Sequence, residues 1–217
     1  MPKGKRQAAA VPCPVCPAAD AAGLGEAVRL LRRGGLIAFP TETYYGLGVD
    51  PLNIGALQRL FAVKQRKPEK PVLVLVAGEE QVPVLAADVP APFRRLMARF
   101  WPGPLTLVCP ARPTLPALLT GGTGTIGIRH SPHPLANRLL HAFGGPTTAT
   151  SANRSGCPPA TTAAEVKNAF GAEVDLVLDG GTTPGGAGST LVACSPDQQL
   201  CCLREGKIAF GDILLQS

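Results

Sequence analysis

Short apolar runs that end directly in polar loops recur along this chain, and this pattern restricts the folds open to it. The clearest run is LIAFP at residues 36–40, which leads into TETYYGLG with both of the chain's tyrosines. A few consecutive apolar residues bounded by turn-forming residues are typical of a buried strand. Loops at the carboxyl ends of strands are the usual ligand sites of open α/β sheets. The sequence therefore predicts an α/β fold whose site is built from loops.

Amphipathic segments between the apolar runs predict helices at residues 21–33, 54–64, 92–100, 134–143, 162–171 and 208–216. Polar caps precede three of them, at Asp20, Asn53 and Thr162. One face of the second helix is formed by Ile54, Leu57, Phe61 and Lys64. Further strands are expected at residues 71–77, 101–111, 124–129, 146–153, 175–181, 189–195 and 200–206. Because strands and helices alternate, the chain is predicted to form a twisted mixed sheet flanked by helices.

The composition agrees with one packed domain. Of the 217 residues, 45% are hydrophobic and 17% are charged, which excludes a disordered chain despite 25 glycines and 23 prolines. Residues 1–19 are rich in alanine, proline and basic side chains and are predicted to form a flexible extension. Residues 20–217 are assigned to a single domain.

Charge and cysteine content bear on partners and location. A net charge of +6 favours an anionic partner, whether nucleotide, pyrophosphate or nucleic acid. No apolar run approaches the roughly 20 residues that span a bilayer, so a cytoplasmic protein without membrane association is expected. Seven cysteines without a disulfide framework fit a reducing compartment. Cys13 and Cys16 form a C-x-x-C motif, which is either a zinc half-site, a redox pair, or two thiols on a tail.

Several familiar catalytic motifs are absent or misplaced. Residues 122–127 match G-x-G-x-x-G, but the segment continues as a strand and then meets a proline, where a dinucleotide site needs a helix. The sequence contains no Walker P-loop, no H-E-x-x-H and no G-x-S-x-G. We therefore expect no resident metal site, and ATP would have to bind by another route.

Four loops remain as candidate ligand sites, at residues 39–48, 64–70, 150–156 and 179–190. The second carries four cations, which suit a triphosphate clamp but equally a solvated helix end. The third and fourth are rich in residues that also build ordinary turns. Their joint occurrence, on loops that can converge at one sheet edge, favours a shared ligand site.

In chain order, the segments GGLIAFPTETYYGLG, KQR, RFWPGPLTLV, GIR, PHP, TSANRSG, DLVLDGG, GSTLV and LREGKI resemble the YrdC-type threonylcarbamoyl-AMP synthase family. The resemblance covers about residues 22–212 and includes the family's K-x-R…S-x-N signature at Lys64, Arg66, Ser151 and Asn153. It implies a YrdC-like twisted mixed sheet, with parallel and antiparallel strands, flanked by helices and carrying a large positively charged concave surface. The chain resembles the short, single-domain form of the family.

The resemblance implies an enzyme, an L-threonylcarbamoyladenylate synthase of the nucleotidyltransferase type. Such an enzyme forms threonylcarbamoyl-AMP and pyrophosphate from L-threonine, bicarbonate or CO2, and ATP. The product serves the N6-threonylcarbamoyl modification of adenosine 37 in ANN-decoding tRNAs, through a separate threonylcarbamoyl transferase complex. ATP is then a substrate used with Mg²⁺, no tightly held cofactor is expected, and tRNA is a further candidate partner.

The family pattern also implies roles for individual residues. Lys64 and Arg66 would be catalytic, whereas the threonine site would contain Thr43, Arg129 and Ser189. The ATP site would contain Arg66, Lys70, Thr125, Ala149, Ser151, Asn153 and Arg204, with Asn153 either contacting ligand or holding its loop. The chain departs from common family residues at Lys70, Leu75 and Pro159, and these departures bear on the threonine contacts and the phosphate geometry, not on the reaction class. Whether Tyr44 or Tyr45 faces the ligand is left open.

Two other functions compete with this enzyme. The first is a non-catalytic module that binds tRNA or double-stranded RNA on the basic concave face, which the net charge of +6 would support. The sequence favours the enzyme because its cations lie in ligand-like loops and few aromatics are available to stack on bases. The second is the carbamoyl-adenylate chemistry of the similar domain in hydrogenase maturation carbamoyltransferases, whose accompanying domains are not visible in this sequence.

Overall fold

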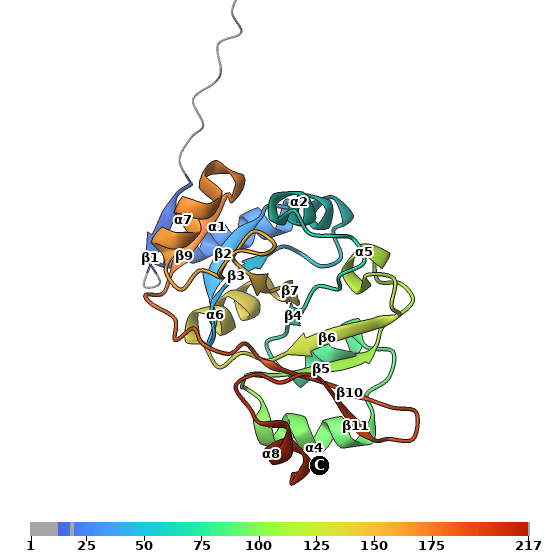
Figure 1. Ribbon diagram of the computed structural model, residues 1–217. Coiled ribbons are helices and arrows are strands. Elements are labelled where there is room, and N and C mark those ends of the chain that lie inside the picture. The colour runs from blue at the N-terminus through green and yellow to red at the C-terminus, as the bar shows by residue number, and fades with distance from the viewer. Residues whose placement is uncertain (1–12, 18–19, 217) are drawn as a thin grey trace, which may run out of the picture.

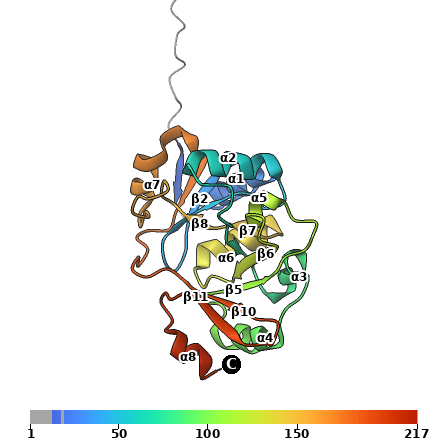
Figure 2. The same ribbon diagram turned by 45° about the vertical axis from the view of Figure 1, so that its right-hand side comes forward.

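Two mixed β-sheets organise the computed structural model, which describes residues 13–17 and 20–216 (Figures 1 and 2). The first sheet has the strand order β1 (Val15–Pro17), β9 (Leu176–Asp179), β2 (Ile37–Pro40), β3 (Tyr45–Gly48) and β8 (Thr150–Ser151). The second has the order β11 (Leu200–Arg204), β10 (Thr190–Cys194), β5 (Leu105–Pro110), β6 (Thr125–Arg129), β4 (Val74–Leu75) and β7 (Thr147–Thr148).

Each sheet contains parallel and antiparallel pairs. In the first, β2 is parallel to β9 and antiparallel to β3, and in the second, β5 is parallel to β10 and antiparallel to β6. The predicted mixture of strand directions flanked by helices is confirmed, but the strands form two sheets instead of one. The chain changes sheets at residues 147–151, because β7 and β8 belong to different sheets although only Ala149 separates them.

Helices surround the sheets (Figure 1). The longer ones are α1 (Ala21–Arg32), α2 (Ile54–Lys64), α4 (Ala91–Phe100), α6 (Pro134–Phe143) and α7 (Ala163–Phe170). The short ones are α3 (Val82–Leu85), α5 (Ala117–Thr120), α8 (Phe210–Leu214) and the 3-10 turns η1 (Glu79–Gln81) and η2 (Gly171–Glu173). The three predicted caps are confirmed: the side chains of Asp20, Asn53 and Thr162 accept backbone N–H groups at 2.9, 3.0 and 3.2 Å. These bonds satisfy donors that a helix start leaves without partners.

Two apolar clusters fill the interior. One lies against α1 and α6 and includes Phe39 and Leu139, whereas the other includes Tyr45, Leu60 and Phe93. Phe39 and Tyr45 are fully buried, and each buried side chain of this size contributes on the order of 1.5–3 kcal/mol. The β2–β3 hairpin is therefore held in place by core packing, which fixes the position of the turn between its strands.

Residues 39–48 were predicted as a loop that leaves a strand, and this part of the prediction is wrong. They form a hairpin in which Phe39 lies opposite Gly46, and the turn is closed by a bond from Thr41 N to Tyr44 O at 3.1 Å. The glycines hid the second strand, because glycine is a poor strand former. Gly48 is required there, since a Cβ would lie 2.6 Å from the Phe39 ring.

The strand predicted at residues 71–77 is reduced to Val74–Leu75. Before it, the chain turns away to α5, where Val72 N donates to Leu119 O at 3.0 Å. Pro71 has no N–H to offer a neighbouring strand, which is one reason why the ladder cannot extend backward.

The extension predicted for residues 1–19 also needs correction. Residues 1–12 and 18–19 lie outside the described part of the chain, but Val15–Pro17 forms a strand that pairs in parallel with β9. Cys13 is buried in the core, so the first sheet already begins within the predicted extension. Among the helices of the described residues, none has the length and apolar character needed to cross a membrane.

Candidate active site

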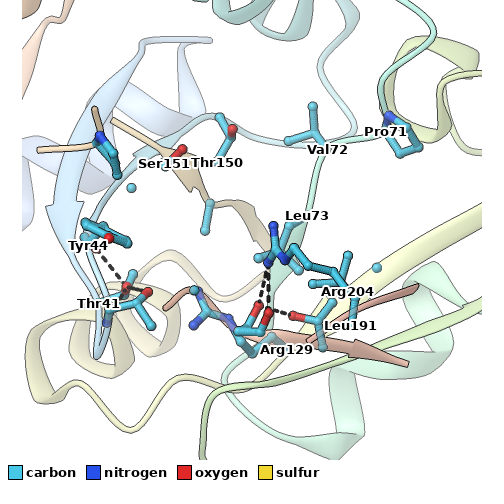
Figure 3. Close-up of a pocket in the computed structure, with 18 of the residues that line it drawn as sticks. Thr41, Tyr44, Pro71, Val72, Leu73, Arg129, Thr150, Ser151, Leu191 and Arg204 are labelled. Atoms are coloured by element: carbon cyan, nitrogen blue, oxygen red, sulfur yellow. Dashed lines mark hydrogen bonds between the residues drawn. The ribbon is translucent and has the colours of Figure 1, made fainter. Parts of the chain in front are cut away.

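A cavity of about 710 Å³ gathers residues from all four loops that the sequence nominated (Figure 3). This volume lies within the roughly 300–1,000 Å³ that is usual for small-molecule sites. The sequence-predicted residues that line it are Thr43, Arg66, Lys70, Thr125, Arg129, Ala149, Ser151, Ser189 and Arg204. Lys64 and Asn153 are not part of the lining. The structure thus brings together residues from distant parts of the chain, while their roles toward ligands stay predictions.

Arg129 supplies a buried cation at the end of β6. Its guanidinium pairs with the carboxylate of Glu42, which also accepts a hydrogen bond from the Ser131 hydroxyl. Arg129 is only 3% exposed, and its Nε has no hydrogen-bond partner among the described residues. Burial, followed by the nearby charge of Arg204, lowers the pKa of Arg129 to about 9, so the side chain stays charged at neutral pH. A buried cation with an unused donor suits a carboxylate ligand.

Ser189 also lines the cavity and contacts two other polar side chains, Thr106 and Arg204. Its hydroxyl is 2.8 Å from the Thr106 hydroxyl and accepts a longer bond of 3.3 Å from Arg204 Nη2. Arg204 also donates to the Ser189 carbonyl at 2.9 Å, as the dashed lines in Figure 3 show. Burial lowers the pKa of Arg204. Strands β5, β10 and β11 thus hold a hydroxyl and a second cation at one wall of the cavity.

The two tyrosines of the hairpin have different environments. Tyr45 is fully buried, its hydroxyl donates to the Gly181 carbonyl at 2.8 Å, and burial raises its pKa to about 12. Both tyrosines are among the residues that line the cavity, and the Tyr44 hydroxyl donates to the Gly186 carbonyl. Both tyrosines therefore bind the segment between β9 and β10, and Tyr44 is the more exposed of the two.

The end of α2 directs Arg66 toward the cavity. Gln65 adopts a left-handed conformation with φ of 52°, and Arg66 N bonds back to Phe61 O at 2.9 Å, which closes the helix. The Arg66 side chain donates from Nε to Lys70 O at 3.1 Å and from Nη2 to Pro71 O at 2.6 Å. These bonds fix the guanidinium, whose pKa is lowered by burial. The exposed Lys70 lines the same wall.

Lys64, for which the resemblance implies a catalytic role, is not among the residues that line the cavity. Its side chain is 1% exposed, and Nζ donates to the Ser151 carbonyl, to the Asn153 carbonyl at 2.7 Å and to Asn153 Oδ1 at 3.3 Å. Burial and then the charge of Arg66 lower the pKa of Lys64 to about 7, while the three oxygens stabilise the charged form. Lys64 is placed to hold the loop after β8.

Asn153 also serves that loop. Its Oδ1 accepts from the Ser151 hydroxyl at 2.6 Å, and its Nδ2 donates to the Cys157 carbonyl at 2.6 Å. Of the two roles expected for Asn153, loop support is the one that its contacts match.

Four other positions that the sequence singled out are Thr125, Ala149, Leu75 and Pro159. Thr125 lies on β6 with its hydroxyl 2.9 Å from that of Thr123, and Ala149 bonds through its N–H to Leu73 O at 2.9 Å. Pro159 lines the cavity, whereas Leu75 is fully buried in the apolar core and does not line it.

Sequence reasoning missed Thr41, Glu42 and Thr106 as parts of the site's construction. Thr41 and Thr106 line the cavity, and Glu42 is the counter-ion of Arg129. A detectable signal existed for Glu42, because it is the one acidic residue among residues 39–48. Thr106 sits within an apolar strand, where a buried hydroxyl needs a partner.

The two cysteines of the C-x-x-C motif have different surroundings. Cys13 is buried in one apolar cluster, and Cys16 packs against the other. Within residues 13–17 and 20–216, no group of three or more His, Cys, Asp or Glu side chains is arranged to hold a metal ion.

Comparison with known proteins gives a consistent match. Residues 29–206 match the model of the Sua5/YciO/YrdC family, which is described by the phrase telomere recombination. The threonylcarbamoyl-AMP synthase of Pyrococcus abyssi is 41% identical over 166 residues, or 76% of this chain. That of Chromohalobacter salexigens is 45% identical over 157 residues, or 72% of this chain.

A crystal structure of Pyrococcus abyssi Sua5 in complex with L-threonine superimposes with a TM-score of 0.87 at 36% identity and covers 93% of this chain. The chain spans about half of the curated Pyrococcus relative, at 49% of its length, but 84% of the Chromohalobacter relative. It likewise covers 59% of the Sua5 chain in the threonine complex.

Proposed function

The chain belongs to the Sua5/YciO/YrdC family, and on this premise we propose that it is a threonylcarbamoyl-AMP synthase. The reaction would join L-threonine, bicarbonate or CO2, and ATP into threonylcarbamoyl-AMP and pyrophosphate. The observation that carries the proposal is one cavity that combines a buried carboxylate-binding cation, Arg129, with a separate cationic wall at Arg66 and Lys70. The relatives named threonylcarbamoyl-AMP synthase support it further.

The amino acid would occupy the wall formed by Thr43, Arg129 and Ser189. Its carboxylate would bind Arg129, whose Nε lacks a partner among the described residues, while Glu42 keeps the guanidinium in place. The two hydroxyls would contact the amine or the β-hydroxyl of the ligand. The threonine bound to Sua5 of Pyrococcus abyssi supports this assignment.

The nucleotide would extend toward the segment after α2. Pro71, which follows Lys70, lies away from Arg129 across the cavity in Figure 3. Arg66 and Lys70 would meet the phosphates, since a fixed guanidinium and a mobile ammonium both suit them. Thr125, Ala149, Ser151 and Arg204 would surround the rest of the nucleotide.

The chemistry requires no protein nucleophile. The threonine amine forms an N–C bond with bicarbonate, and water leaves as the carbamate is produced. A carbamate oxygen then bonds to the α-phosphorus of ATP, the bond to the β-phosphate oxygen breaks, and pyrophosphate leaves with the electron pair. Positioned cations can hold the two anions together and neutralise the charge that develops on the leaving group.

Magnesium enters this proposal only as part of the MgATP substrate. Within the described residues, the cavity lining contains hydroxyls and cations but no carboxylate that would hold the ion. Mg²⁺ is commonly bound through substrate phosphates with few protein ligands. For the later steps, we propose that the adenylate passes to a threonylcarbamoyl transferase complex that modifies tRNA.

The test is to incubate the purified protein with L-threonine, bicarbonate, Mg²⁺ and ATP. Pyrophosphate and threonylcarbamoyl-AMP are the expected products, measured by a coupled assay and by mass spectrometry. Omission of threonine or bicarbonate serves as the control and should abolish both. Pyrophosphate release that ignores threonine would contradict the proposal. Salt-sensitive tRNA binding without affinity for ATP would favour the alternative of a non-catalytic RNA-binding module.

A further inference from the structure

The hydroxyl of Thr41 uses its whole hydrogen-bonding capacity inside the β2–β3 turn. It donates its only hydrogen to the Tyr44 carbonyl at 2.8 Å, since a carbonyl oxygen can only accept. It accepts from the N–H of Thr43 at 3.2 Å and lies 3.1 Å from the Thr43 hydroxyl (Figure 3). A hydroxyl cannot donate the same hydrogen twice. The hydrogen between the two threonine hydroxyls must therefore come from Thr43.

The consequence is that Thr43 offers only lone pairs to the cavity. Thr41 and Thr43 are 2% and 5% exposed, so little of either side chain is open to water that could replace a bond that the turn loses. Rotating the Thr43 hydroxyl toward a ligand acceptor would break its bond to Thr41, which costs about 0.5–1.5 kcal/mol. The turn thus determines the polarity of a hydroxyl that lines the cavity.

We propose that Thr41 is a specificity-determining residue that fixes Thr43 as a hydrogen-bond acceptor, so that the site selects an amino acid with a polar hydrogen at this point. The inference rests on the proposed function, because it takes the ligand to be an amino acid. The β-hydroxyl and the amine of threonine are the two groups that carry such a hydrogen. An ether oxygen in the same position has only lone pairs, so it could not form a hydrogen bond with the Thr43 oxygen, which also offers only lone pairs.

The experiment measures binding by isothermal titration with three ligands: L-threonine, L-2-aminobutyrate, which lacks the hydroxyl, and O-methyl-L-threonine, which lacks only its hydrogen. The proteins are the unaltered chain, Thr41→Val, Thr41→Ser and Thr43→Val. Thr114→Val is the matched control, because Thr114 is exposed and outside the cavity lining. Thermal unfolding of each variant establishes that it is folded.

We expect the unaltered chain to prefer threonine over its O-methyl ether by roughly tenfold, the usual effect of one hydrogen bond. In Thr41→Val this preference falls toward twofold, because the Thr43 hydroxyl is free to turn and donate to the ether. Thr41→Ser restores it, and Thr114→Val retains it. Weakening of all three ligands by a similar factor in Thr41→Val would mean that Thr41 only supports the turn, and would overturn the inference.

A folded Thr41→Val variant with unaltered affinities for all three ligands would overturn the inference. Should that variant fail to fold, Thr43→Val decides, because it leaves the bond from Thr41 to the Tyr44 carbonyl in place. Unaltered affinities in Thr43→Val would overturn the inference equally. If the unaltered chain bound none of the three amino acids, the proposed function would fall and this inference with it.

Discussion

Replacing Lys64 by methionine distinguishes between two roles for this lysine, catalysis and support of a loop. The family resemblance implies a catalytic role, whereas the structure surrounds the ammonium with carbonyl oxygens of Ser151 and Asn153. Methionine has a similar length and no charge, so it fills the space without donating a hydrogen bond. We expect the variant to lose its hold on the loop after β8 while the core stays packed.

The stability cost follows from the contacts that remain. Ser151 O still accepts from Asn153 N at 2.9 Å, and Asn153 Oδ1 still accepts from the Ser151 hydroxyl at 2.6 Å. The Asn153 carbonyl loses its Lys64 partner, which costs about 1–3 kcal/mol. In the opposite direction, a buried ammonium no longer has to be desolvated, and this returns a few kcal/mol. The net change in unfolding free energy should stay within about 2 kcal/mol.

The functional effect should be larger than the effect on stability. Ser151 lines the cavity and Lys64 fixes its carbonyl, so a loosened loop should weaken ATP binding by about tenfold, or 1.4 kcal/mol. Titration calorimetry with ATP and urea unfolding measure the two quantities. Lys167→Met is the matched control, because Lys167 is an exposed lysine on α7 and outside the cavity lining. This control variant should change neither the ATP affinity nor the free energy of unfolding.

Two results would refute this reasoning. Normal ATP affinity combined with a turnover lowered by more than about a thousandfold would mean that Lys64 acts on the reacting groups. The second concerns pH: the folded pKa of Lys64 is lowered from 10.5 to about 7, so between these values the unfolded chain binds more protons. Unfolding free energy should then rise with pH relative to Lys64→Met over this window. A constant difference between the two proteins would contradict the assigned burial.

Three further substitutions test the cavity residues and the backbone segments that position them. Glu42→Gln should weaken threonine binding by roughly tenfold while leaving ATP affinity unchanged in calorimetry, because Arg129 loses its counter-ion and Ser131 its charged acceptor. Gln65→Gly should raise the free energy of urea unfolding by about 0.5–1 kcal/mol, since φ is 52° there and the left-handed region strains a side chain. Gly206→Ala should lower both the free energy of unfolding and the threonine affinity, because the added Cβ would lie 2.2 Å from Gly188 O and 2.5 Å from the backbone of Ser189. If neither quantity changed, the segment around Gly206 would be free to shift.

The features that sequence reasoning predicted correctly are those with local causes. Asp20, Asn53 and Thr162 cap helices within three residues of themselves, so their roles can be read from neighbouring positions. The convergence of the loops was predictable in part, because three of the four follow an expected strand and strand ends meet at sheet edges, whereas residues 64–70 follow α2. No ligand needed to be known for either inference.

The features that were missed depend on long-range pairing. Glu42 meets Arg129 across 87 residues of chain, and nothing near either residue indicates the other. The division into two sheets depends on Thr148 and Thr150 pairing with different neighbours, which a run of similar residues at 146–153 does not reveal. The hairpin strand at residues 45–48 was concealed by two glycines whose purpose, close packing on Phe39 at Gly48, appears only in three dimensions.

The K-x-R signature shows how a sequence pattern and a site can differ. Lys64 belongs to the helix face of Leu57 and Phe61, which the periodicity already indicated, and that face is buried. Gln65 then adopts a left-handed conformation, so the chain reverses before Arg66 and turns this side chain into the cavity. Two cations one residue apart therefore face different surroundings, one holding a loop from inside and one lining the site. Both residues nevertheless serve the same cavity. Lys64 holds the loop that contains Ser151, and Ser151 and Arg66 both line the cavity, which explains why the two cations occur together in one motif.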